Sequence, residues 1–367
     1  MLCGLQRYIK YFAILGLVPW SEKGAQQQVQ KIYTMAIILL NNCMTFYVIV
    51  YAPPDVKILV SMLVSIIVFI TQTVTMTVIE LQVMCQYKRY YEFCLHLKCL
   101  KLRFQCELQQ PIVDLPWTRY IKFFLLGILN VLTLVPSVLV VLYNDYVGHF
   151  LYSVPSLIII RFQCLLLVIY AELLGYHVEL LGERLQAVHK SRQLGTDSLC
   201  SLEHLLSLKR VYMELYHLFV QYNDLYGWSI VCIFVVMFLD SMINIYWAMQ
   251  ILNEVYEWPF LYLTCSSFLP LLILLFTFCR CGEYCKRQHI LIGSHVRGLA
   301  CASQRQAASP PLAYNAVLAE FAMQVEQDAL IISAEGFMDI DYSLLMSIFT
   351  AMVTYLIILT QFGSLSA

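Results

Sequence analysis

The sequence predicts an all-α integral membrane protein with seven transmembrane helices, a cytoplasmic N-terminus and an extracellular C-terminus. Three observations support this prediction: the composition, the number of long apolar segments, and the distribution of lysine and arginine. Of the 367 residues, 60% are hydrophobic and 13% are charged, and the mean hydropathy is +0.71. Globular domains carry about 25% charged residues, so this composition does not suit a water-facing surface. The net charge of -1 gives no general attraction for nucleic acid, and no nucleic-acid partner is expected.

A transmembrane helix needs about 20 predominantly apolar residues. Seven segments meet this need, and they cover residues 32–52, 57–82, 120–143, 150–175, 227–251, 258–280 and 342–362. The earlier stretch YFAILGLVPW, residues 11–20, is too short to span a bilayer, so we expect it to lie at the membrane interface. It does not resemble a signal peptide, because no clean small-residue cleavage site follows it.

Lysine and arginine gather on one side of the predicted membrane. The segments before span 1, between spans 2 and 3, between spans 4 and 5, and between spans 6 and 7 contain 21 of the 23 basic residues. The positive-inside rule places these segments in the cytoplasm. G-protein-coupled receptors have seven spans in the opposite orientation, and this chain also lacks their NPxxY and D-R-Y motifs. That class of receptor is therefore excluded.

The cytoplasmic segments are long and amphipathic. Residues 176–193 are expected to continue span 4 as a helix, and residues 202–226 to run helically into span 5. A further helix is predicted for residues 312–333, whose apolar face carries Leu318, Phe321, Val325, Ala329 and Ile332. Lipid does not cover helices this far beyond the bilayer, so they should pack together as a cytoplasmic bundle. A break follows, with Gly336 as a C-cap or hinge.

The last predicted span carries a polar stripe. Spacings of 3, 4, 4 and 3 residues place five side chains on one helical face: Ser347, Thr350, Thr354, Ile358 and Gln361. Packing against another helix accounts for serine and threonine, whereas the Gln361 amide needs several partners or water. The stripe alone leaves both helix packing and the lining of a water-filled path open. Because one helix cannot enclose a path, pore lining requires several copies in a symmetric oligomer.

The same region carries a specific motif. Residues 334–362 read AEGFMDIDYSLLMSIFTAMVTYLIILTQF. This stretch resembles the C-terminal signature of the insect gustatory receptors, which ends in TY, five hydrophobic residues and QF. YFAILGLVPW is similar to the Gly-x-x-Pro element near the N-terminus of that family. The family often has two aromatic residues after the glycine, where this chain has Phe337 and Met338.

This resemblance implies a ligand-gated, non-selective cation channel in the plasma membrane of chemosensory neurons. Such receptors form homotetramers or heteromers with related subunits. Their last helix is split into a cytoplasmic part and a pore-lining part. Carried over by position, Ile358 would be the hydrophobic constriction, Gln361 a polar ring, and Phe362 its neighbour. The stripe would then face cations at the axis of the tetramer.

The resemblance also divides the chain into regions. A cytoplasmic N-terminus with a short interfacial element (1–31) precedes a six-helix ligand-sensing region with cytoplasmic extensions (32–280). A cytoplasmic anchor segment (281–341), the pore-lining helix (342–362) and an extracellular tail (363–367) follow.

The implied pocket for a small-molecule tastant lies among the first six spans and opens to the outside. Arg161 in span 4 and Asp240 in span 5 have similar predicted depths, and a charge in hydrocarbon needs a partner. We expect them either to form a structural pair or to contact a polar tastant. Further candidate contacts are aromatic and polar residues: Tyr143, Tyr152, Asn244, Tyr246, Trp247, Gln250, Tyr262 and Thr264. Aromatic residues also gather at membrane interfaces without any ligand. Nothing specific to the sugar receptors is found, so a bitter or other aversive compound is favoured.

No catalytic, metal or cofactor site is predicted. The eight histidines are scattered without metal-ligand spacing, and no nucleophile–base pair or phosphate-binding loop is found, so an enzyme is not expected. Cys279, Cys281 and Cys285 are interpreted as ordinary cysteines beside the membrane, with metal binding or reversible acylation as alternatives.

The alternative function is a secondary transporter of a small molecule. It would need internal repeats and broken helices at matching positions. We detect no repeat, and the candidate mid-span prolines are Pro136, Pro155 and Pro270.

Overall fold

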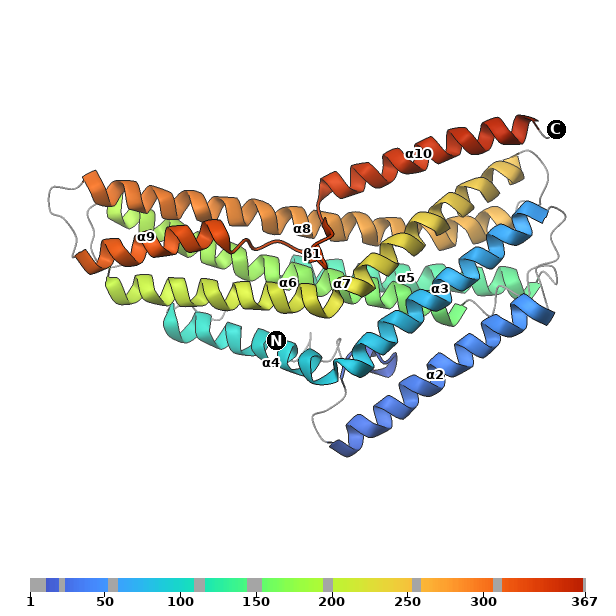
Figure 1. Ribbon diagram of the computed structural model, residues 1–367, viewed down its shortest axis with the longest axis horizontal. Helices are drawn as coiled ribbons and strands as arrows, with labels where there is room; N and C mark the ends of the chain where they lie inside the picture. Colours follow the sequence, from blue (N-terminus) through green and yellow to red (C-terminus); the bar gives the residue numbers. More distant parts are fainter. Residues whose placement is uncertain are drawn as a thin grey trace.

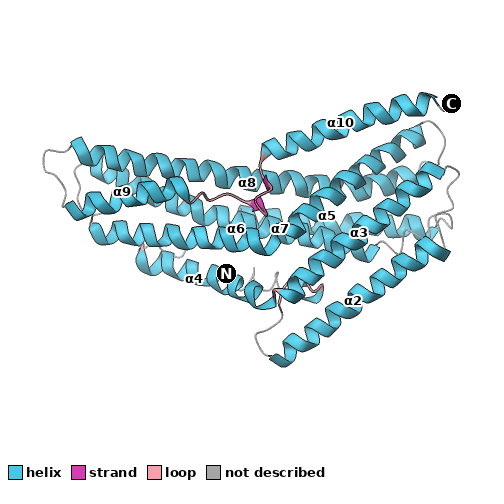
Figure 2. Ribbon diagram, in the orientation of Figure 1, coloured by secondary structure: helices cyan, strands magenta, loops and turns pink. Residues whose placement is uncertain are grey.

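The computed structural model of the chain is almost entirely helical (Figure 2). It describes residues 11–19, 24–51, 59–108, 116–143, 154–193, 201–252, 259–305 and 312–365. The helices are α2 (Gly24–Tyr51), α3 (Leu59–Cys85), α4 (Tyr87–Glu107), α5 (Trp117–Tyr143), α6 (Val154–Gln193), α7 (Leu202–Leu252), α8 (Pro259–Arg305), α9 (Leu312–Gln327) and α10 (Tyr342–Leu365). Two short strands, β1 (Ser333–Ala334) and β2 (Met338–Asp339), pair antiparallel between α9 and α10.

A helix occupies each segment that the sequence predicted as a span. Within the described residues, six helices are long and apolar enough to cross a membrane: α2, α3, α5, α6, α7 and α8. The apolar stretch of α10 is shorter and covers Tyr342–Ile358. Helices α5 and α8 continue through Pro136 and Pro270, and Pro155 is the second residue of α6.

Three long helices, α6, α7 and α8, run along the elongated molecule (Figure 1). They contain 40, 51 and 47 residues, which corresponds to lengths of about 60 to 75 Å. Helices α2, α3, α5 and α10 lie at one end, and α4 and α9 at the other. Helix α6 is central: every residue from Cys164 to Ala171 is buried, because this run is apolar on all sides of the helix.

The end that holds α4 and α9 is a helical bundle, which we call the extension bundle. It consists of α4, α9 and the adjoining parts of the long helices, residues 176–193, 202–226 and 281–305. The predicted helical continuations of spans 4 and 5 are confirmed by α6 and α7. Helix α8 continues well beyond the expected end of span 6 at residue 280.

The helix predicted for residues 312–333 ends earlier, at Gln327. The Asp328 amide still donates to the Gln324 carbonyl, but beyond it two backbone carbonyls accept from side chains of α7. The Tyr212 hydroxyl donates to the Asp328 carbonyl (2.6 Å), and Asn223 Nδ2 donates to the Ile331 carbonyl (3.0 Å). These tertiary partners satisfy carbonyl groups that a helix would otherwise use.

Residues 11–19 form a short helical turn and a bend against α2 and α6. The Tyr33 hydroxyl donates to the Ile14 carbonyl (3.0 Å), and the ring of Phe12 meets that of Phe162 edge-on at 5.9 Å. The segment is too short to span a bilayer. Its position at the membrane interface stays a prediction.

Candidate functional site

Helix α10 packs on α7 and α8 with one face and exposes the opposite face. Leu345 and Met352 are buried on the packed face, and the Tyr355 ring meets Phe238 of α7 edge-on at 6.0 Å. At 100° per residue, the predicted stripe lies about 140 to 220° around the helix from Leu345. The stripe therefore occupies the face that this chain leaves free.

The hydroxyls of the stripe are bonded within α10. Ser347, Thr350 and Thr354 are exposed, and each donates to the carbonyl four residues earlier at 2.8 to 2.9 Å. Such bonds satisfy the hydroxyl hydrogen and leave the oxygen free to accept. The exposed face is thus polar without needing a partner inside the chain.

The predicted gate lies further along the same face. Ile358 is 40% exposed, as expected for an apolar side chain that points away from α7 and α8. The side chains of Gln361 and Phe362 lie outside the described residues.

Arg161 is fully buried where four helices meet. Its Nη1 donates to Thr133 Oγ1 of α5 (3.1 Å), and its Nη2 donates to the Ser266 carbonyl of α8 (2.7 Å). It also interacts electrostatically with Asp240 of α7. This interaction supplies the opposite charge that a buried cation needs inside a membrane protein, and a direct Arg161–Asp240 ion pair stays a prediction. Contact of either residue with a tastant stays a prediction.

The structure describes the side chains of only some of the other predicted ligand contacts. Asn244 is buried and donates to the Asp240 carbonyl of its own helix (2.7 Å), whereas Tyr246 and Trp247 are partly buried. Tyr262 is 70% exposed and lies on the surface of this chain, and its contact with a ligand stays a prediction. The remaining side chains lie outside the described residues: Tyr143, Tyr152, Gln250 and Thr264.

Two buried polar residues escaped the sequence reasoning. Glu80 of α3 and Gln163 of α6 are both 0% exposed, and neither side chain has a hydrogen-bond partner among the described residues. For Glu80 the signal was present, because a carboxyl group in an otherwise apolar helix is a functional candidate by default. For Gln163 it was weaker, since glutamine carries no charge.

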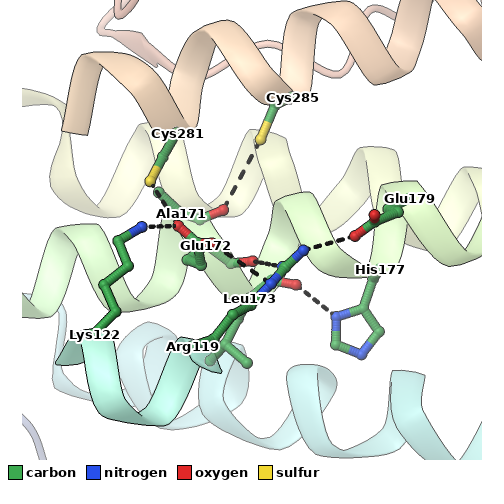
Figure 3. Close-up of polar contacts among 9 residues, drawn as sticks. All are labelled: Arg119, Lys122, Ala171, Glu172, Leu173, His177, Glu179, Cys281 and Cys285. Carbon is green, nitrogen blue, oxygen red and sulfur yellow. Dashed lines mark hydrogen bonds and ion pairs between the residues drawn. The ribbon is translucent and has the colours of Figure 1, made fainter. Parts of the chain in front are cut away.

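A cluster of ion pairs holds the start of α5 against α6 (Figure 3). Lys122 Nζ lies 2.6 Å from Glu172 Oε2, and Arg119 Nη2 lies 2.7 Å from Glu179 Oε2. Cys281 of α8 donates to the same Glu172 oxygen at 3.0 Å. Two of the basic residues that indicated the cytoplasmic side are thus neutralised by carboxylates of α6.

The three neighbouring cysteines of α8 are packed inside the protein. Cys279, Cys281 and Cys285 are all buried, and Cys285 lies 3.9 Å from the Ala171 carbonyl (Figure 3). Acylation needs an accessible thiol, so burial argues against it. Among the described residues, no group of three or more metal-ligating side chains is placed to bind a metal. The positions agree with ordinary packing cysteines.

An apolar groove of about 350 Å³ lies between the N-terminal segment, α5 and α6. Its lining is Tyr11, Phe12, Phe124, Gly127, Ile128, Val131, Leu132 and Phe162. None of the predicted ligand contacts belongs to this lining.

Comparison with known proteins identifies the family. Residues 5–366 match the model of the 7tm chemosensory receptor family. The chain is 47% identical to a Drosophila melanogaster protein provisionally named gustatory receptor 39b, over 99% of this chain and 100% of that protein. The chain belongs to the insect gustatory receptors. Another relative of this gustatory receptor, D. melanogaster gustatory receptor 23a, is 29% identical over 42% of this chain and 40% of its own length.

The gustatory receptor also shares its fold with a solved structure. The olfactory receptor OR5 from Machilis hrabei has been solved alone and in complex with eugenol. The two structures match this receptor with TM-scores of 0.69 and 0.71, at 13% identity, over 98% of this chain and 99% of OR5. The two receptors therefore have the same helical architecture.

Proposed function

We propose that this gustatory receptor is a ligand-gated, non-selective cation channel in which four copies arrange α10 around a central pore. The observation that carries the proposal is the polar stripe on the free face of α10, opposite the face packed on α7 and α8. A symmetric ring of four subunits would bring the four stripes together and leave each packed face unchanged.

In this proposal the chain crosses the plasma membrane of a chemosensory neuron seven times, with residues 1–31 inside and residues 363–367 outside. The extension bundle then lies in the cytoplasm and joins the subunits, which are identical or related. Ile358, Gln361 and Phe362 form the gate near the outer end of α10.

The proposed ligand is a small tastant, with a bitter or other aversive compound favoured over a sugar. It would bind in the outer half of the six-helix region, near Arg161 and Asp240. The binding of eugenol, a small molecule, by a receptor of the same fold supports this ligand size.

Cysteine accessibility along α10 tests the pore. Thr350→Cys and Thr354→Cys receptors would be expressed, and cation currents recorded before and after treatment with a positively charged thiol reagent. We expect modification to reduce the current severalfold, because it places a fixed charge in the conduction path. Met352→Cys, on the packed face, and the unchanged receptor with its native cysteines are the controls.

Particle imaging in lipid nanodiscs provides an independent test. A four-fold particle with α10 at its axis is expected. A stable monomer, together with currents that thiol modification of Thr350→Cys and Thr354→Cys leaves unchanged, would refute pore lining. Saturable flux without single-channel events would indicate the transporter instead.

A further inference from the structure

The connection between α9 and α10 is held tightly by α7. Asn223 uses both ends of its side-chain amide: Nδ2 donates to the Ile331 carbonyl (3.0 Å), and Oδ1 accepts from the Ser333 amide (3.0 Å). The hairpin turn that follows has left-handed φ values of 51° at Glu335 and 70° at Gly336. Positive φ at both central residues is characteristic of a type I′ turn. Gly336, predicted as a C-cap or hinge, thus lies within an ordered hairpin.

Helix α8 meets the residue that follows this hairpin at very close range. Ile340 is 1% exposed, and its carbonyl faces the backbone of α8 at Gly282. A Cβ atom at Gly282 would overlap the Ile340 carbonyl oxygen and lie 2.9 Å from its carbonyl carbon. Only glycine permits this approach.

One turn further along α8, a lysine binds the next residue. Lys286 Nζ lies 2.9 Å from Asp341 Oδ2. The other carboxylate oxygen, Oδ1, accepts from the Ser343 and Leu344 amides at 2.9 and 3.1 Å. Asp341 is therefore the N-cap of α10, and one carboxylate joins the first turn of α10 to α8.

The same helix contacts the candidate ligand region. The Ser266 carbonyl of α8 accepts from Arg161, and Gly282 lies 16 residues further along, about 24 Å at 1.5 Å per residue. A continuous helix joins these two places. Displacement of α8 near Arg161 would therefore reach Ile340 and Asp341 without an intervening loop.

We propose that Gly282 and Lys286 form a clamp on Ile340 and Asp341 that transmits movement of α8 to α10. Lys286 and Asp341 are positioning residues for gating, since neither lies on the proposed pore face. The gating role rests on the proposed channel function. The attachment of α10 to α8 stands on its own contacts.

Hydrogen exchange and basal ion flux test the two parts separately. Lys286→Met removes the charge at similar length, and Asp341→Asn removes the charge but keeps a good N-cap. We expect each to raise the exchange rate of amides in residues 340–348 of the purified receptor by about fivefold or more, with no further increase in the double variant. Lys286→Arg should restore slow exchange. Arg287→Met is the matched control, because Arg287 pairs with Glu283 of its own helix.

Sodium flux from proteoliposomes, without added tastant, supplies the gating readout. The clamp predicts that both single variants change the basal flux in the same direction, whereas Lys286→Arg and Arg287→Met match the unchanged receptor. Unchanged exchange in both single variants, or additive effects in the double variant, overturns the clamp. Faster exchange with unchanged flux in a conducting receptor overturns its gating role. If no variant conducts, the channel proposal fails, while the exchange result still decides whether α8 holds α10.

Discussion

The strongest prediction concerns the single methyl group added by Gly282→Ala. In the interior of an exposed helix, alanine is about 1 kcal/mol more favourable than glycine. At Gly282 the added Cβ atom would overlap the Ile340 carbonyl, which belongs to buried backbone and is held by the neighbouring hairpin. Backbone cannot rotate away as the end of a flexible side chain can. Helix α8 and the start of α10 must therefore separate.

The magnitude follows from the two opposing effects. Overpacking of a well-packed contact costs about 1 to 3 kcal/mol. Separation would also lengthen the 2.9 Å ion pair between Lys286 and Asp341. Because the overlap is with backbone, the upper part of that range applies, about 2 to 3 kcal/mol. Subtracting about 1 kcal/mol of helix propensity and adding up to about 1 kcal/mol for the weakened, partly exposed ion pair gives a net loss of about 1 to 3 kcal/mol.

The matched control is Gly293→Ala on the same helix. Its added Cβ atom would meet Val325 Cγ1 at 3.6 Å, an ordinary van der Waals contact. Here the helix-propensity gain of up to about 1 kcal/mol should remain. The free energies of unfolding of the two purified variants, measured in one detergent, should therefore differ by about 1 to 4 kcal/mol, with Gly282→Ala below the unchanged receptor and Gly293→Ala equal to it or above it. Equal or greater stability of Gly282→Ala would refute the close contact between α8 and Ile340.

Three further predictions use the same stability and exchange measurements. Asn223→Ala should destabilise the receptor by about 2 kcal/mol, because it removes two hydrogen bonds and leaves the Ile331 carbonyl and the Ser333 amide without this partner. A variant that unfolds at the same temperature as the unchanged receptor would contradict this. Burial raises the pKa of Asp341, but hydrogen bonds from Ser343 and Lys286 outweigh it and lower the pKa to about 2. Since the folded pKa lies below the unfolded value of about 3.9, this stabilisation is complete above about pH 5 and is lost progressively as the pH falls from there through about 2. Exchange of residues 340–348, corrected for intrinsic rates, should therefore show no transition between pH 8 and 5, and a midpoint near pH 6 would contradict the assignment. Gln163→Leu should leave the free energy of unfolding unchanged or raise it, because it removes a buried amide without a hydrogen-bond partner among the described residues. A fall of more than about 2 kcal/mol would show that the amide is hydrogen-bonded in the folded receptor.

The helices could be predicted because their signals are local. Long apolar runs and the amphipathic pattern of residues 176–193 and 202–226 depend on the order of neighbouring residues, and the structure has helices there. The polar stripe of α10 followed from the helical period alone, and its described members share the face that the chain leaves free.

The connection before α10 could not be predicted, because its structure depends on distant residues. Helix α9 ends early since Tyr212 and Asn223 of α7 supply hydrogen-bond partners from more than 100 positions away. No neighbouring residue marks Gly282 as special, because its role depends on a carbonyl 58 residues later in the chain. The sequence did not predict helix α4 for a similar reason. The apolar residues on its buried side are recognised as one face only when its packing against α7 is known.

The contacts that join Arg161 to α8, and α8 to α10, all lie within one polypeptide. In the proposed channel, a subunit with this arrangement would need its neighbours to complete the ring, but would carry movement from Arg161 to α10 through its own helix α8. Residues in the outer half of such a subunit could then change without altering the contacts that join α8 to α10, because those contacts lie at Gly282 and Lys286.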